Sequence, residues 1–197
     1  MRNENVRNLT TMAFFVALII LMGFTPVGYI PLGFINVSIL AIPVVIGTIL
    51  LGLQKGMILG ACFALTSILR AFGIGGAPSS LVATLMAASP IYMIVMSLAP
   101  RLLIAVTTHF VYRAAEKRLG SVKAVMPAAV LGSFTNTVFY LGLMLVFYIM
   151  AGIDTAPVVG LIGGTAVISG TAEAVAAALI STPIIAALGK VMHKEKR

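Results

Sequence analysis

The chain has 197 residues, of which 60% are hydrophobic and only 9% are charged, and its mean hydropathy is +1.14. A soluble domain usually carries about a quarter charged residues, so this composition cannot cover a water-facing surface and excludes a soluble globular enzyme. A membrane-spanning helix takes roughly 20 apolar residues, and the length leaves room for roughly five to seven of them. The sequence therefore predicts an all-α integral membrane protein in which residues 1–197 form a single membrane domain.

The net charge of +8 comes from basic residues that flank hydrophobic segments. Cytoplasmic loops of membrane proteins carry such an excess of Lys and Arg. A nucleic-acid-binding surface would gather its basic residues in one stripe, and the sequence has no such stripe, so we expect no nucleic-acid partner. The basic clusters are Arg2 with Arg7, Lys55, Arg113 to Lys123, and Lys190 to Arg197.

Hydrophobic runs and the breaks between them predict six spans. Glycine, proline and polar residues interrupt the apolar runs at 26–31, 53–56, 73–80 and 151–164, as they do in turns and loops. The spans are predicted at residues 9–25, 35–52, 57–72, 100–115, 124–150 and 165–188.

The stretch 81–112 is too long for one ordinary span and too short for two. If 81–99 crossed the membrane alone, the later segments would reverse and the basic cluster at 113–123 would face outside, against the usual charge distribution. We therefore interpret 81–99 as a long, partly helical external loop between the third and fourth spans. Six spans place the N and C termini in the cytoplasm, together with every Lys and Arg except Arg70 and Arg101.

Arg70 ends the third predicted span and Arg101 starts the fourth, both toward the external side. Charged side chains at membrane depth cost about 2.5–3.5 kcal/mol each on insertion scales and usually line a functional cavity. Each guanidinium either extends to the outer membrane interface, or the two form a clamp for an anionic solute, because the guanidinium fork matches a carboxylate.

Glu173 and Asn136 are polar residues inside the sixth and fifth predicted spans. Glu173 either pairs with Arg101 or accepts hydrogen bonds from solute hydroxyl or amide groups. Asn136 either joins two helices by a hydrogen bond or binds the solute. Because each residue lies a similar number of positions from the loop between the two spans, an antiparallel pair of helices would set them at comparable depth.

Three further residues are candidate ligands of the same solute. Asn36 is either a polar ligand or a helix cap, and Tyr92 and Tyr140 form either one wall of a cavity or the usual aromatic belt at the membrane interface. Together with the charged residues, these side chains gather in the external half of the predicted bundle. That distribution indicates a cavity that opens outward.

The sequence carries no motif for catalysis, for a metal or for a nucleotide. It has no Gly-x-x-x-x-Gly-Lys-Ser/Thr loop to hold ATP phosphates. His109 and His193 have no Cys, Asp or Glu at metal-ligand spacing. We therefore expect neither a cofactor nor an enzymatic activity.

Ala13 and Ala17 lie four residues apart, on one face of the first predicted span. Small residues at this spacing let a second helix approach closely. The second helix is either another part of this chain or a partner protein.

In the order of its motifs and its topology, nearly the whole chain resembles the substrate-binding S components of energy-coupling factor (ECF) vitamin transporters. The size and the six spans with both ends inside belong to this likeness. The remaining motifs are Ala13-x-x-x-Ala17, Pro100-Arg101-Leu102-Leu103, Thr135-Asn136-Thr137 and the sixth span that contains Glu173.

The resemblance implies a subunit of an ABC-type importer in a bacterial cell membrane. Such proteins hold a vitamin in an occluded pocket near the outer face, formed by helices four to six and the external loops. They have no ATPase of their own and dock on a membrane coupling subunit (EcfT-like) that carries two cytoplasmic ATPase subunits. The alanine motif of helix one contacts that subunit, and the S component topples within the bilayer to carry its pocket inward.

The resemblance is greatest to pantothenate-type members, through the segment Thr25-Pro26-Val27-Gly28-Tyr29-Ile30-Pro31 and Asn136. It implies that Arg101, supported by Arg70, holds the vitamin carboxylate, while Asn136 and Glu173 bind hydroxyl and amide groups. S components for other vitamins, such as folate or riboflavin, remain alternatives. Two further readings are a structural membrane protein whose polar groups pair with one another and a carrier that works without an ATPase.

Overall fold

The computed structural model describes residues 2–25, 28–31, 36–163 and 167–194, and in this part of the chain eight helices and one small sheet are found. The elements are α1 Arg2–Gly23, β1 Tyr29–Pro31, β2 Asn36–Ser38, α2 Ala41–Leu51, α3 Leu53–Ala71, α4 Ser80–Ala88, α5 Pro90–Leu119, α6 Val125–Met150, α7 Ala156–Leu161 and α8 Val167–Lys194.

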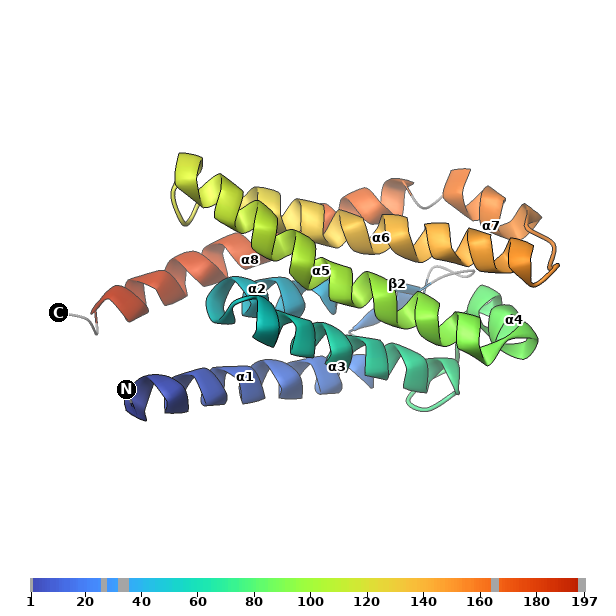
Figure 1. The fold of residues 1–197 in the computed structure, drawn as a ribbon, viewed down its shortest axis with the longest axis horizontal. Coiled ribbons are helices and arrows are strands. Elements are labelled where there is room, and N and C mark those ends of the chain that lie inside the picture. The colour runs from blue at the N-terminus through green and yellow to red at the C-terminus, as the bar shows by residue number, and fades with distance from the viewer. Residues whose placement is uncertain (1, 26–27, 32–35, 164–166, 195–197) are drawn as a thin grey trace.

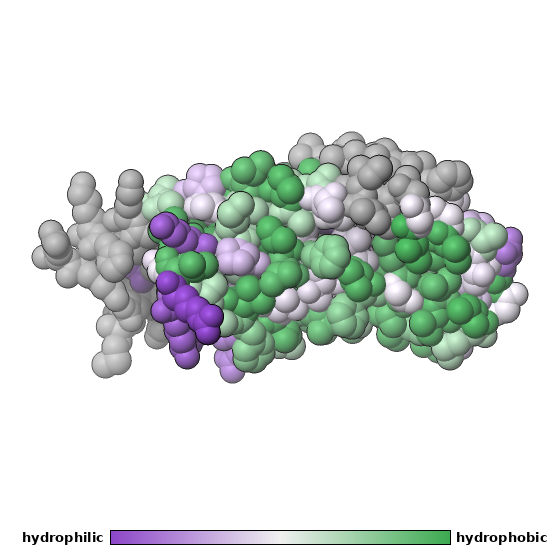
Figure 2. Space-filling model, turned by 90° about the horizontal axis from the view of Figure 1, so that it is seen from above, coloured by the Kyte–Doolittle hydropathy of each residue, from purple (hydrophilic) through white to green (hydrophobic). Residues whose placement is uncertain are grey.

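The long helices run side by side along one axis of an elongated bundle (Figure 1). The start of α1, the end of α8 and the turn between α5 and α6 lie at one end, and α4 and α7 lie at the other. Hydrophilic side chains gather most strongly at the first of these ends, and the middle of the molecule is mainly hydrophobic (Figure 2). This arrangement suits a protein that is surrounded by lipid along its length.

Four helices in the described residues are long and apolar enough to cross a membrane: Val6–Gly23 of α1, all of α5, all of α6, and Gly170–Ala187 of α8. The predicted helical class is confirmed. The third predicted span corresponds to α3, which has 19 residues and carries a charged residue near each end. The predicted count of six spans and the cytoplasmic position of both termini stay predictions.

The second predicted span, 35–52, contains a shorter helix than expected. Residues 36–38 of this span form β2, which pairs antiparallel with β1 in a hairpin that sets Tyr29 opposite Ser38. Only the 11 residues of α2 are helical, and eight of them are buried among the other helices. The helix ends at Gly52, whose φ of 87° favours glycine.

The predicted start of the fourth span, 100–115, is wrong. The helix α5 begins at Pro90 and continues through Pro100 to Leu119, and α4 occupies most of the remaining predicted loop. Pro90 takes the first helical position, where a missing N–H costs nothing. A proline inside a membrane helix is tolerated when neighbouring groups bond the carbonyl that it frees, so Pro100 does not end the helix.

Two clusters of buried hydrophobic side chains hold the bundle together. The larger cluster joins α1, α2 and α3 to α8 and to the adjoining halves of α5 and α6, with Ile19, Val45 and Phe63 among its members. The second cluster joins α4 and α7 to the other halves of α5 and α6, with Leu85 and Tyr148 among its members. Tyr148 also donates a hydrogen bond from its hydroxyl to the Leu81 carbonyl, at 2.6 Å.

The helices α3 and α5 pack with their backbones close together at Gly60. A Cβ atom at this position would lie 2.6 Å from the carbonyl oxygen of Arg101, so only glycine allows this approach. The contact fixes the part of α5 that carries Arg101 against α3.

Candidate binding site

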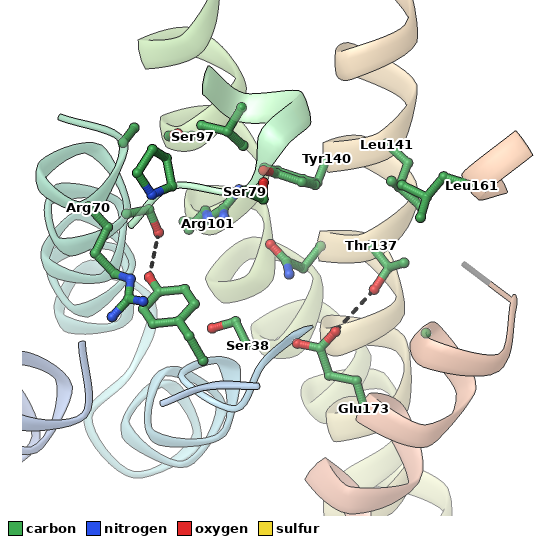
Figure 3. A pocket seen from close by; sticks show the side chains of 17 residues that line it. Ser38, Arg70, Ser79, Ser97, Arg101, Thr137, Tyr140, Leu141, Leu161 and Glu173 are labelled. Carbon is green, nitrogen blue, oxygen red and sulfur yellow. Dashed lines mark hydrogen bonds between the residues drawn. The ribbon is translucent and has the colours of Figure 1, made fainter. Parts of the chain in front are cut away.

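A cavity lies between the two hydrophobic clusters, near the end of the bundle that carries α4 and α7. Residues from β1, β2 and each of the helices from α3 to α8 line it, together with the segment that leads into α4 (Figure 3). Arg101, Arg70, Asn136, Glu173 and Tyr140 are all among the lining residues. The structure therefore brings five of the seven predicted ligand residues to one cavity.

The Arg101 side chain is 5% exposed and is held by contacts on three sides. Its Cζ atom lies 4.5 Å from the centre of the Tyr140 ring and 5.1 Å from the centre of the Phe63 ring. Such cation–π contacts stabilise a desolvated cation. Its Nη1 atom donates a hydrogen bond to the Met96 carbonyl at 3.3 Å, and its buried Nε–H has no partner in the described residues.

Glu173 faces the cavity from α8 and is bonded to α6 rather than to an arginine. Thr137 donates a hydrogen bond from its hydroxyl to Glu173 Oε2 at 3.3 Å (Figure 3). The other carboxylate oxygen, Oε1, is buried without a hydrogen-bond partner. No hydrogen bond or ion pair joins Glu173 to Arg101 in the described part of the chain.

Asn136 lines the cavity one residue before Thr137 on α6. Its side chain is buried, and its Oδ1 atom has no partner among the described residues. Buried polar atoms in proteins are nearly always hydrogen-bonded. Asn136 Oδ1 and Glu173 Oε1 are therefore two acceptors that a bound molecule with N–H or O–H groups can satisfy, while the Arg101 Nε–H is a donor for an anionic group.

Arg70 also lines the cavity, but its guanidinium is bonded to backbone carbonyls of neighbouring segments. Its Nη1 atom donates to the Gly23 carbonyl at 3.4 Å and to the Gly75 carbonyl at 3.1 Å. Its Cζ atom lies 4.5 Å from the centre of the Tyr29 ring, and the Tyr29 hydroxyl is 2.9 Å from the Ser67 hydroxyl. Arg70 thus connects the end of α1, strand β1 and the segment between α3 and α4.

Two predicted ligands are not placed in the cavity wall. The Tyr92 ring stacks on Phe147, with centroids 4.9 Å apart and planes at 7°, and Tyr92 is not among the residues that line the cavity. The backbone of Asn36 begins β2, but its side chain lies outside what the structure describes.

Several cavity residues carried no signal in the sequence. Five side chains that carry a hydroxyl group line the cavity but were not predicted as ligands. They are Tyr29, Ser38, Ser67, Ser79 and Ser97. Serine is common in every kind of segment, and only the position of Tyr29 between two prolines marked its segment as a loop.

Ala13 and Ala17 are exposed on the surface of α1. The opposite face of the same helix carries Phe15 and Ile19, which are buried in the larger cluster. The two alanines therefore do not contribute to packing inside the described chain, and the face that they share is accessible to another helix.

The chemistry of the cavity suits an organic solute. It offers one fully buried guanidinium, one carboxylate, one amide and several hydroxyls from serine, threonine and tyrosine. No group of three or more His, Cys, Asp or Glu side chains that could hold a metal ion is found in the described residues.

Comparison with known proteins identifies the family. Residues 7–188 match the family described as ECF transporter, substrate-specific component. The chain is also 27% identical, over 201 aligned positions, to the pantothenic acid transporter PanT of Lactococcus lactis subsp. cremoris (strain MG1363); the alignment covers 98% of this chain and 99% of that protein. The chain therefore belongs to the family of substrate-specific components of ECF transporters, and it is a subunit of a membrane transporter and not an enzyme.

Proposed function

We propose that this protein binds pantothenate from outside a bacterial cell and delivers it inward across the cell membrane. The observation that carries the proposal is the single buried Arg101, whose free Nε–H shares one cavity with two unpartnered acceptors, Asn136 Oδ1 and Glu173 Oε1. Pantothenate has one carboxylate for the guanidinium, and an amide N–H and two hydroxyls for the acceptors. The similarity to a pantothenic acid transporter supports the same substrate.

In this proposal each polar residue has one task. Arg101 holds the carboxylate, and Asn136 and Glu173 accept hydrogen bonds from the hydroxyl and amide groups. Tyr140 keeps the Arg101 guanidinium in place by stacking. Arg70 adds positive charge near the carboxylate and joins the end of α1 to the segment between α3 and α4 through its two carbonyl contacts.

In this proposal, delivery of the vitamin into the cell depends on a partner protein. The family is that of ECF transporter components, and the sequence has no ATP-binding loop of its own. We infer that Ala13 and Ala17 form the docking face for a membrane coupling subunit with two cytoplasmic ATPase subunits. The whole chain then acts as one membrane domain with both termini in the cytoplasm.

Titration calorimetry on the purified protein tests the substrate. We expect pantothenate to bind and folate and riboflavin not to bind, because neither of those vitamins combines a single carboxylate with a small body rich in donors. Native mass spectrometry of the same preparation identifies any vitamin that is purified with the protein.

An Arg101→Met variant tests whether the bound pantothenate depends on the guanidinium. Methionine retains an unbranched side chain between Tyr140 and Phe63 but removes every N–H donor. We expect loss of pantothenate binding with an unchanged elution profile in size-exclusion chromatography. Binding of folate or riboflavin in place of pantothenate would reassign the substrate, and binding of no vitamin at all would favour a structural role.

A further inference from the structure

Pro100 lies inside α5, directly before Arg101. In an α-helix the N–H of each residue bonds the carbonyl four positions earlier, and proline has no N–H. The carbonyl that Pro100 leaves without its usual donor belongs to Met96. Arg101 Nη1 donates to this same carbonyl, at 3.3 Å.

We propose that Pro100 is a positioning residue for substrate recognition, because it frees the Met96 carbonyl to anchor the Arg101 guanidinium at the cavity. The inference rests on the proposed binding of an anionic substrate by Arg101. It assigns to the proline a role in selecting the charge of the substrate, in addition to its effect on the shape of the helix.

The surroundings of the guanidinium make this anchor important. Met96, Pro100 and Arg101 are all buried, so water does not compete for the carbonyl or for the N–H groups. The guanidinium Cζ lies 5.1 Å from the centre of the Phe63 ring and 4.5 Å from that of the Tyr140 ring. The hydrogen bond to the Met96 carbonyl holds the edge of the fork that carries Nη1, while the buried Nε–H has no partner in the described residues, so this bond helps to set which edge faces a ligand.

Replacing the proline restores competition for the carbonyl. An alanine at position 100 has an N–H that points along α5 at the Met96 oxygen, and this N–H competes with Arg101 Nη1 for that oxygen. The competition draws the guanidinium away from its anchor. A ligand without a negative charge does not depend on that alignment and should lose less affinity.

The test compares Pro100→Ala with the wild type by titration calorimetry against pantothenate and pantothenol, the analogue in which a neutral hydroxymethyl group replaces the carboxylate. We expect the preference for pantothenate over pantothenol to fall about tenfold, the size expected for one hydrogen bond to a charged group. Equal losses for the two ligands would overturn the proposal.

Pro183→Ala supplies the matched control, since Pro183 also lies inside a long helix, α8, but its side chain is exposed. Its replacement should leave the preference unchanged. If both prolines reduced the preference equally, the effect would belong to helix shape in general.

A second measurement needs no ligand and so separates this inference from the proposed function. In protein labelled with ¹⁵N-arginine, the Arg101 side-chain signal is assigned as the one missing in Arg101→Met. We expect Pro100→Ala to make this signal more mobile, with the other arginine signals unchanged. An Arg101 signal that is unaffected by Pro100→Ala would refute the anchor even if the wild type bound a different vitamin.

Discussion

At the scale of single residues, the polar atoms of the cavity divide into those that are bonded within the protein and those that are not. The carboxylate of Glu173 belongs to both groups, because Oε2 accepts a hydrogen bond from Thr137 while Oε1 is buried without a partner. A buried acceptor that lacks a donor is costly, by about 1–3 kcal/mol. A ligand that supplies the donor recovers that free energy on binding, so such atoms are where selectivity is expected.

We predict that Glu173→Gln weakens pantothenate binding by about tenfold, because hydrogen bonds to a charged acceptor are stronger than those to a neutral amide. Glutamine keeps the size of the side chain, so the walls of the cavity are retained. Thr137→Val is the control: it removes the contact to Oε2 and leaves Oε1 unchanged, and it should cost less affinity. Calorimetry that shows a larger loss for Thr137→Val would mean that the carboxylate is only held in place and does not touch the vitamin.

Sequence reasoning finds the charged and amide residues of this site because charges are expensive inside a membrane. The same reasoning cannot find Ser67 or Tyr29. Serine costs little in a membrane helix, and Tyr29 reaches the site through the hairpin of β1 and β2, which brings together residues that no helical periodicity relates. Whether a polar atom is partnered, as Thr137 and Glu173 show, depends on packing between helices and is absent from the pattern of residues.

At the scale of elements, α1 differs from the other long helices in how little of it is covered. Within its apolar window 17% is buried, against 44% for the window in α5. Phe15 and Ile19 attach it to the bundle, and Ala13 and Ala17 lie on its exposed side. This division separates the residues that stabilise the fold from those available to a partner.

We predict that Ala13→Trp stops pantothenate uptake by cells and leaves binding by the purified protein within twofold of the wild type. A ring on this face prevents the close approach of helices that small residues allow, and Ala13 is not among the residues that line the cavity. Phe14→Trp is the control, because Phe14 is 61% exposed on a neighbouring side and already carries a ring. Loss of binding in Ala13→Trp would show that α1 supports the cavity.

The first residue of α5 is an element boundary that the sequence pattern predicts wrongly. Breaks at proline predict a helix that begins at Pro100, whereas α5 begins ten residues earlier. The sequence marks the proline but does not show that Arg101 bonds the carbonyl the proline frees. By contrast, the predicted fifth span at 124–150 matches α6 at Val125–Met150 closely, because no proline or charge interrupts its centre.

At the scale of the whole molecule, the bundle has two chemically different ends. The turn between α5 and α6 follows a basic last turn of α5 with Lys117 and Arg118. The opposite end, beyond α6, carries Asp154 and the short helix α7. The excess of positive charge predicts that the first end faces the cytoplasm.

Thiol labelling can test that orientation with few substitutions, because Cys62 is the one cysteine in the sequence and only it has to be removed. In a Cys62→Ala background, we expect Asp154→Cys to react with a membrane-impermeant maleimide on intact cells. Ser121→Cys, in the α5–α6 turn, should react only after the membrane is opened. Both positions are exposed, so access to the reagent depends on the side of the membrane, and the reverse labelling pattern would refute the predicted topology.

The division of the interior into two hydrophobic clusters has a consequence for how long the protein survives in a cell. The cavity lies where the clusters meet, so a vitamin molecule there contacts both and acts as part of the interior. A ligand that binds only the folded state adds about 2.7 kcal/mol of stability at roughly 100 times its Kd. We expect limited proteolysis to cleave the protein more slowly when pantothenate is added, and a starved cell to degrade this subunit faster than a well-fed one.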